Sequence, residues 1–264
     1  MSTGLPTKTG QSDLLHALYG RHGEAPLPVL AAQSPADCFN TLIEAFRIAI
    51  RYMTPVIVLM DAYLANAAEP WKIPAVETLE LPKVTFNRFP KPYQRDEEYC
   101  RSWNLPGSPG YIHQIGGLEK QGDDGHVSYD PANHQEMVNI RAQKIANIAK
   151  HYPPLRVEGD ASARTLLIGF GSTYGSLRAA IVDLPVAYVH LRHMHPLPLD
   201  LAEVLAKYET IVVAELNSGQ LCQVIRAKYL VDAQSITQCT GQPFTKSFLL
   251  EAIHNVIHDE VIHG

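Results

Sequence analysis

The hydrophobic pattern of the first 71 residues predicts one strand–helix–strand unit. A short apolar run at 28–31 is followed by Ser34-Pro35, which is typical of a helix start: a serine cap with proline at the first helical position. Apolar residues then recur at helical spacing: Phe39, Leu42, Ile43, Phe46 and Ile50. Thr54-Pro55 ends the helix, and the run at 56–60 (VIVLM) is apolar throughout, like a parallel strand covered on both faces. Two strands and one helix have no core of their own, so the rest of this sheet must come from elsewhere in the chain or from another chain.

Residues 161–264 alternate regularly between strand and helix patterns. Strands are predicted at 164–170, 186–191 and 210–215, and helices from after Gly175 to about 184 and at 200–207, 219–229 and 246–258. Such alternation is typical of an open parallel sheet with helices on both faces. The sequence therefore predicts the α/β class, with a complete small α/β domain in this part of the chain.

Residues 72–160 are rich in Pro, Gly and Asp, and only one helix is predicted there, at 133–150. Its inward residues are expected to be Met137, Ile140, Ile145 and Ile148. A loop-rich stretch of this length is usually functional or packed against a partner. We interpret it as a linker that lies on other surfaces.

Composition and charge indicate the size of the fold and which kinds of partner are unfavourable. With 264 residues, of which 46% are hydrophobic, the chain can form one large or two modest domains. A net charge of -5 does not favour nucleic acid, and no apolar run approaches the roughly 18 residues of a membrane span. The four cysteines, Cys38, Cys100, Cys222 and Cys239, form no CxxC pair, which favours reduced cytoplasmic thiols and no iron–sulfur cluster or zinc held by this chain.

Two motifs raise the question of ligand binding. The GFGSTYG turn at 169–175 joins a strand to a helix, as phosphate-binding turns do, but it lacks the third glycine of GxGxxG and the acidic residue about 20 positions later. Phosphate binding and simple tight packing of the turn both remain open. His190, His193 and His195 suggest a metal, but alternation along a strand directs His190 away from the other two, so no metal site is predicted.

The order of motifs along the whole chain is more specific than any one of them. STGLPTKT at 2–9 is followed by SPADCF, TPVIVLMDAYLANAAEPW, GGLEKQ, SYDPANH, GFGSTYG, HLRHMHPLP, AELNSGQL and AKYLVDAQS. Together these closely resemble the alpha subunit of 2-oxoglutarate:ferredoxin oxidoreductase, within the wider 2-oxoacid:ferredoxin oxidoreductase family.

The resemblance implies a domain organisation. Residues 1–71 correspond to the second half of a thiamine pyrimidine-binding domain with a parallel sheet, 72–160 to a loop-rich linker with one helix, and 161–264 to a domain like the C-terminal domain of transketolase. The family's alpha subunit is longer and carries an N-terminal domain and the first half of the pyrimidine-binding domain ahead of the STGLPT loop. The sequence is therefore expected to be truncated at its N-terminus.

The resemblance also implies an activity. This is the oxidative decarboxylation of 2-oxoglutarate with coenzyme A, which gives succinyl-CoA and electrons for ferredoxin. Thiamine diphosphate with magnesium is expected in a shared site bound mainly by a beta subunit, which also holds the 4Fe–4S cluster. The two chains would form a heterodimer or a dimer of heterodimers in the cytoplasm, and this chain alone would be inactive.

The resemblance assigns substrate binding to two hydroxyls of the opening loop, Thr7 and Thr3, and no catalytic residue to this chain. Hydroxyls on a loop fixed by Gly4 and Pro6 can donate hydrogen bonds to a 2-oxoacid. Without the resemblance, the sequence fits equally well a purely structural role, in which these threonines cap the turn and the helix beginning near Leu14. No cofactor-binding residue is assigned.

Three alternatives stay open. Pyruvate or another 2-oxoacid is the nearest, because substrate choice depends on a few groups. A non-catalytic docking module or an inactive gene fragment is the second, and an independent nucleotide-binding enzyme that uses GFGSTYG is the third.

Overall fold

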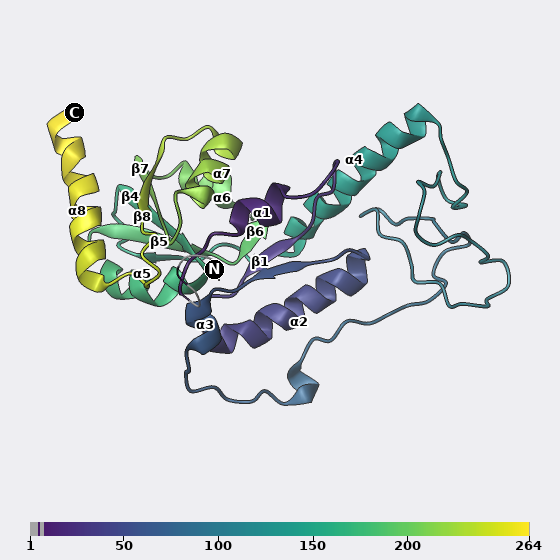
Figure 1. The fold of residues 1–264 in the computed structure, drawn as a ribbon, viewed down its shortest axis with the longest axis horizontal. Helices are drawn as coiled ribbons and strands as arrows, with labels where there is room; N and C mark the ends of the chain where they lie inside the picture. Colours follow the sequence, from purple (N-terminus) through teal and green to yellow (C-terminus); the bar gives the residue numbers. More distant parts are fainter. Residues whose placement is uncertain (1–4, 6–7, 264) are drawn as a thin grey trace.

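The computed structural model describes residue 5 and residues 8–263, which form a mixed α/β fold with two sheets (Figure 1). The smaller sheet has the order β2-β1-β6. β1 (Val29–Ala31) pairs in parallel with β2 (Ile57–Leu59), and α2 (Pro35–Tyr52) connects them. The third strand, β6 (His193–His195), pairs antiparallel with β1 and comes from the distant C-terminal part of the chain. This confirms that part of the first sheet is supplied from elsewhere in the chain.

The larger sheet has the order β3-β5-β4-β7-β8. Its central strands are parallel and fully buried: β4 (Thr165–Phe170), β5 (Val186–Leu191) and β7 (Thr210–Glu215). The two edges are β3 (Val157–Gly159), which runs antiparallel to β5, and β8 (Ala233–Thr237), which runs parallel to β7.

Helices cover both faces of the larger sheet, as predicted. Leu167, Tyr188 and Val212 point to one face and pack against α5 (Tyr174–Ile181) and α8 (Lys246–His263). The opposite face packs against α6 (Leu201–Leu205), α7 (Gln220–Tyr229) and α1 (Leu14–Tyr19). Alternate residues of each buried strand therefore serve two separate cores.

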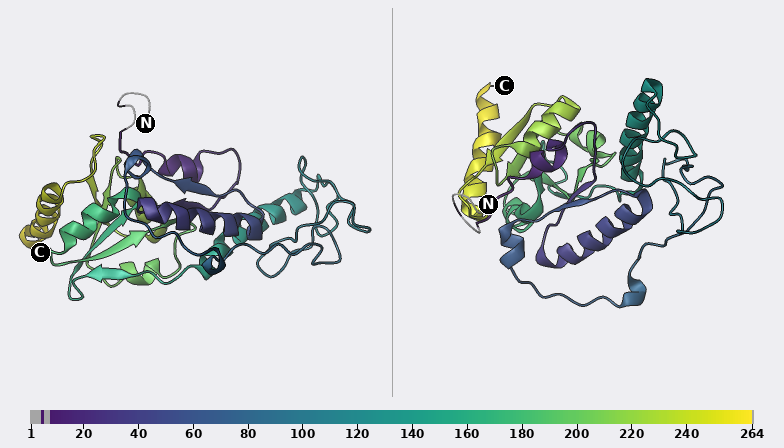
Figure 2. Two further views of the ribbon diagram at one scale, coloured as in Figure 1. Left: turned by 90° about the horizontal axis from the view of Figure 1, so that it is seen from below. Right: turned by 45° about the vertical axis from the view of Figure 1, so that its right-hand side comes forward.

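The segment between α3 (Ala62–Asn66) and α4 (Pro131–Asn147) extends away from both sheets as an arm (Figures 1 and 2). It contains one short 3-10 helix, η1 (Val76–Thr78), and a second, η2 (Ile148–His151), continues α4. Large apolar side chains are exposed along it, with Ile112 95% and Ile115 80% accessible.

Two features differ from the expectations. The sequence pattern missed β3, β6 and β8, which are short or polar edge strands whose partners lie elsewhere in the chain. The apolar stripe of α2 does not coincide with its buried face: Leu42 and Phe46 are about 60% exposed, whereas Thr41, Ala45 and Ile48 are buried.

A buried ion network joins α2 to the corner between β5 and β6. The Arg192 guanidinium lies 3.0 Å from Asp37 and 3.3 Å from Glu44, and it donates to the Thr41 hydroxyl at 3.0 Å. Glu44 also contacts His193 Nε2 at 2.6 Å. All the charged members are at least three-quarters buried, so each charge depends on its partner for stability.

No helix within residues 8–263 combines the length and apolarity that crossing a bilayer requires.

The network gives a stability prediction. Arg192→Met leaves two buried carboxylates without their cation and should lower the free energy of unfolding by about 3 kcal/mol in urea denaturation. The matched control is Arg226→Met, because the Arg226–Asp232 pair is mostly exposed; it should cost less than about 1 kcal/mol. Equal losses in the two variants would contradict a structural role for the network.

Candidate functional site

Residues 9–12, which follow the opening loop, lie on the carboxyl ends of strands of the larger sheet. The side-chain amide of Gln11 donates to the Phe170 carbonyl at 2.7 Å and accepts from the Leu216 amide at 2.9 Å. The Gln11 backbone binds Leu216 and the Asn217 side chain as well. One buried residue therefore connects the loop to the ends of β4 and β7.

The glycine-rich turn lies directly beside this loop. Gly171 has φ +59, and a Cβ there would lie 2.7 Å from Gln11 Nε2, so both the backbone conformation and the close approach require glycine. Ser172, in η3 (Gly171–Thr173), donates its hydroxyl to the Asp61 carboxylate at the end of β2. The turn is thus occupied by an amide and a carboxylate of this chain, and the carboxylate disfavours a phosphate at that position.

A second carboxylate is buried nearby. Glu215 ends β7, is fully buried, and accepts hydrogen bonds from the amides of Leu221 and Cys222 in the first turn of α7. Asn217 accepts from Gly219 and Gln220 at the same helix start. Burial raises the pKa of Glu215, and these hydrogen bonds oppose the shift. These hydrogen bonds fix the end of β7 against α7. They therefore also fix Leu216, to which Gln11 binds.

The carboxylate of Asp61 has an unusual environment. It caps α3 by accepting from the Leu64 amide at 3.2 Å and also accepts the Ser172 hydroxyl. Burial raises the pKa of Asp61 above its usual range, because the charged form loses solvation there.

The space at this seat is small. A pocket of about 40 Å³ lies between residues 10–14, the ends of β1 and β2, and Gly171. Ligand pockets usually measure about 300 Å³ or more, and the polar groups here already bind one another. This pocket by itself is therefore too small to enclose thiamine diphosphate.

The residues expected to bind substrate, Thr3 and Thr7, lie outside the described part of the chain. Thr9, which follows them, is buried, and its amide donates to the Gly241 carbonyl at 3.1 Å.

The three histidines of HLRHMH do not converge. His190 binds the Tyr188 hydroxyl at 2.6 Å, His193 binds Glu44, and His195 binds the Leu27 carbonyl at 2.7 Å. Burial lowers the pKa of His190 to about 3, so this imidazole is neutral near pH 7. Among the described residues, no three potential ligands are arranged to hold a metal ion.

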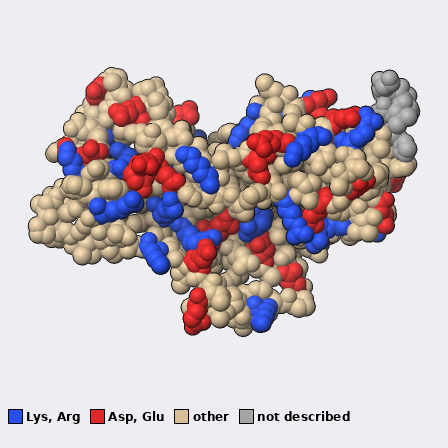
Figure 3. All heavy atoms as spheres, turned by 180° about the vertical axis from the view of Figure 1, so that it is seen from behind, with Lys and Arg blue, Asp and Glu red and all other residues tan. Residues whose placement is uncertain are grey.

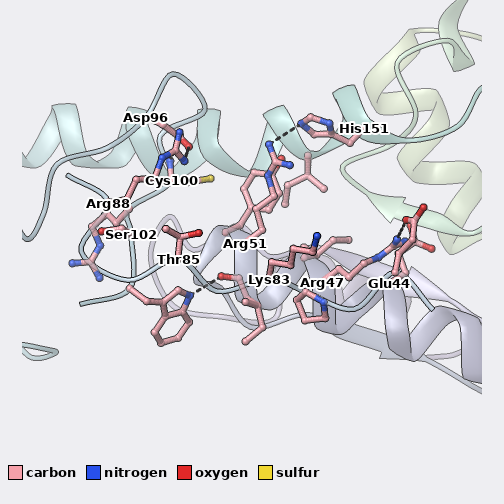
Figure 4. A pocket seen from close by; sticks show the side chains of 18 of the residues that line it. Glu44, Arg47, Arg51, Lys83, Thr85, Arg88, Asp96, Cys100, Ser102 and His151 are labelled. Atoms are coloured by element: carbon pink, nitrogen blue, oxygen red, sulfur yellow. Dashed lines mark hydrogen bonds and ion pairs between the residues drawn. The ribbon is translucent and has the colours of Figure 1, made fainter. Parts of the chain in front are cut away.

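A larger groove of about 780 Å³ lies along α2 (Figure 4). Its walls come from α2, residues 80–103 of the arm and η2. They carry both positively and negatively charged side chains. Three ion pairs cross or border it: Arg47–Glu80, Arg51–Glu98 and Arg88–Asp96. Basic and acidic side chains are likewise interspersed over the face drawn in Figure 3, without a broad field of one sign.

Sequence reasoning missed Gln11, Asp61, Ser172 and Glu215. A signal existed for two of them, because Asp61 and Glu215 each follow an apolar strand directly, and the carboxyl ends of parallel strands are where α/β proteins place their sites. No local pattern marks Gln11, whose partners lie more than 150 residues away.

Comparisons with known proteins agree over the length of this chain. Residues 1–148 match the family described as pyruvate flavodoxin/ferredoxin oxidoreductase, thiamine diphosphate-binding. The 2-oxoglutarate oxidoreductase subunit KorA of Mycobacterium tuberculosis is 51% identical over 253 residues, which is 92% of this chain and 38% of the relative. A 2-oxoacid:ferredoxin oxidoreductase 1, subunit alpha, of Sulfurisphaera tokodaii is 32% identical over 274 residues, 98% of this chain and 43% of the relative.

A solved structure has the same fold. The 2-oxoglutarate:ferredoxin oxidoreductase from Magnetococcus marinus, with 2-oxoglutarate, coenzyme A and succinyl-CoA bound, superposes with a TM-score of 0.87 at 32% identity. The match covers 97% of this chain and 46% of that one. The chain therefore spans less than half the length of these relatives.

The raised pKa of Asp61 predicts a pH dependence. Between the unfolded value of about 3.9 and the higher folded value, the folded state binds the proton more tightly, so Asp61 makes folding less favourable as pH rises. Asp61→Asn keeps a capping oxygen without the charge. The stability of this variant relative to wild type should therefore increase from about pH 4 to pH 7 in urea denaturation. A relative stability that falls over this range would contradict the raised pKa of Asp61. Glu215 is present in both proteins, so its own contribution to the pH dependence cancels in the comparison.

Proposed function

The chain belongs to the pyruvate flavodoxin/ferredoxin oxidoreductase, thiamine diphosphate-binding family, and on that premise we propose that it acts within the alpha subunit of a 2-oxoglutarate:ferredoxin oxidoreductase. The reaction is the oxidative decarboxylation of 2-oxoglutarate with coenzyme A to succinyl-CoA, with two electrons passed to ferredoxin. The observation that carries the proposal is 51% identity, over almost the whole chain, to a relative named for 2-oxoglutarate.

The proposal includes a protein partner, the beta subunit. Two surfaces of this chain support it. The order β2-β1-β6 leaves the outer edge of the apolar strand β2 without a neighbouring strand among the described residues. The outer face of α2 exposes Leu42 and Phe46, and Met60 beside β2 is 53% exposed. Unpaired apolar edges and contiguous apolar faces are typical of protein interfaces.

We assign the cofactors mainly to that partner. Thiamine diphosphate with magnesium would lie in a site shared between the subunits, and the 4Fe–4S cluster would lie in the beta subunit. The small pocket beside Gln11 supports a shared site, since it cannot enclose the cofactor alone. Thiamine, when bound, supplies the group that stabilises the carbanion left by decarboxylation. The assembly would be a heterodimer or a dimer of heterodimers.

We keep the three-part division at residues 71 and 160 as part of this proposal, with β6 of the third part completing one edge of the first sheet. A cytoplasmic location is supported by the four cysteines, all of which are free thiols.

Substrate recognition is assigned to Thr7 and Thr3. The support is the position of the residues that follow them: Thr9 binds Gly241, and Gln11 binds the ends of β4 and β7. A loop whose following residues are fixed to the larger sheet can present hydroxyls in a defined place. Pyruvate is the alternative substrate.

The activity test compares three anaerobic samples in the reduction of a viologen dye: this chain alone, this chain with its beta subunit, and a chain extended to the length of its relatives with the beta subunit. Activity that depends on both 2-oxoglutarate and coenzyme A is expected only in the third. Activity with pyruvate but not with 2-oxoglutarate would make pyruvate the substrate. Inactivity of every sample would favour a non-catalytic docking role.

The loop assignment predicts a substrate effect. In the active complex, Thr7→Val removes one hydroxyl at constant shape and should raise KM for 2-oxoglutarate about tenfold, as expected for one lost hydrogen bond to a charged group. Thr78→Val, in the exposed helix η1, is the control and should leave KM unchanged. An unchanged KM in Thr7→Val would show that Thr7 does not contact the substrate.

A further inference from the structure

Two arginines of the arm face each other directly. Arg95 and Arg101 form an antiparallel bridge, and the Asp96 amide donates to the Cys100 carbonyl at 2.9 Å inside the turn between them. Residues opposite each other in such a bridge have Cα atoms about 4.5–5.5 Å apart, and like charges in that position repel. The backbone therefore brings the Cα atoms of two cationic residues together, and their charges interact unfavourably.

A third cation, Lys144 of α4, contacts the backbone of Tyr52, which lines the groove along α2, and its charge interacts with those of Arg101 and Arg95. Each of the three is held by uncharged groups. Lys144 Nζ donates to the Tyr52 carbonyl at 2.8 Å, Arg95 donates to the Gly122 carbonyl at 3.2 Å, and the Arg101 guanidinium lies 4.0 Å from the centre of the Tyr93 ring. These contacts orient the side chains without neutralising them.

No carboxylate of the described residues lies within 4.0 Å of any of the three cations. Asp123 and Glu136 act on Arg95 only from a longer distance. Burial lowers the pKa of Lys144, and Arg101 and Arg95 add to the shift. Burial also lowers the pKa of Arg95, with Arg101 as the next cause. The cluster is thus half-buried, positively charged and without a counter-ion of its own.

The cluster is connected to the groove along α2. Arg101 lines that groove together with Cys100 and Ser102, and Lys83 reaches into it from the arm (Figure 4). Lys83 likewise has no ion pair among the described residues. The volume of about 780 Å³ is enough for a ligand larger than a simple ion.

We propose that Arg95, Arg101 and Lys144 bind the phosphate group of a small anionic ligand whose remainder lies in the groove. Guanidinium groups match phosphate oxygens in pairs, and a phosphate monoester carries about two negative charges near pH 7, which a monocarboxylate does not. The bound anion serves as the counter-ion. Its negative charge attracts both arginines and so offsets the repulsion between them. The site is separate from the loop seat at Gln11.

The test titrates the full chain with inorganic phosphate, pyrophosphate and succinate at constant ionic strength and pH 7.5, by calorimetry. Saturable binding of phosphate or pyrophosphate is expected, with succinate weaker. Arg101→Gln should weaken phosphate binding about 10- to 100-fold, as for a lost charge-assisted hydrogen bond. Lys144→Gln serves as a second variant if the first does not fold, and should weaken binding in the same direction.

The matched control is Arg156→Gln, since the Arg156 side chain is 83% exposed and lies beside β3, outside the cluster. It should bind phosphate as wild type does. Absence of saturable binding to the wild-type chain would overturn the proposal. So would wild-type affinity in folded Arg101→Gln or Lys144→Gln, or equal binding of succinate and phosphate.

Discussion

The position of Arg192 constrains the whole architecture. A guanidinium buried at the corner between β5 and β6 requires carboxylates, and Asp37 and Glu44 of α2 supply them. This fixes α2, and with it β1 and β2, to the larger sheet. β6 is then held where it can pair with β1. The same Glu44 also lines the groove along α2, so the ion network and the wall of the groove share one residue.

The loop seat follows from this arrangement of the two sheets. The ends of β2 and β4 meet at Asp61 and Ser172, and Gln11 enters between them. A loop without regular structure normally leaves backbone groups to water, but residues 9–12 find partners on Gly241, Leu216 and Gln220. Residues 9–12 are therefore as well bonded as an internal loop, although they lie in no strand or helix.

Local pattern predicted the central elements well and the edges poorly. The strands at 186–191 and 210–215 have the predicted bounds because they are apolar throughout and buried on both faces. β6 and β8 carry polar residues, and β6 depends on a partner far away in sequence. The predicted substrate residues Thr3 and Thr7 lie outside the described structure, and Gln11 could not be found from any motif. For α2, the pattern indicated an apolar face but not what would cover it.

The pairing of β1 with β6 has a consequence for how the protein is made. Arg192 and Asp37 are 155 residues apart, so neither the third strand nor the central ion pair of the N-terminal part exists until most of the chain has left the ribosome. Contacts of such separation slow folding. Until they form, α2 and β2 expose their apolar sides to other nascent chains. The N-terminal part therefore keeps apolar surface exposed during synthesis until β6 and Arg192 have been made.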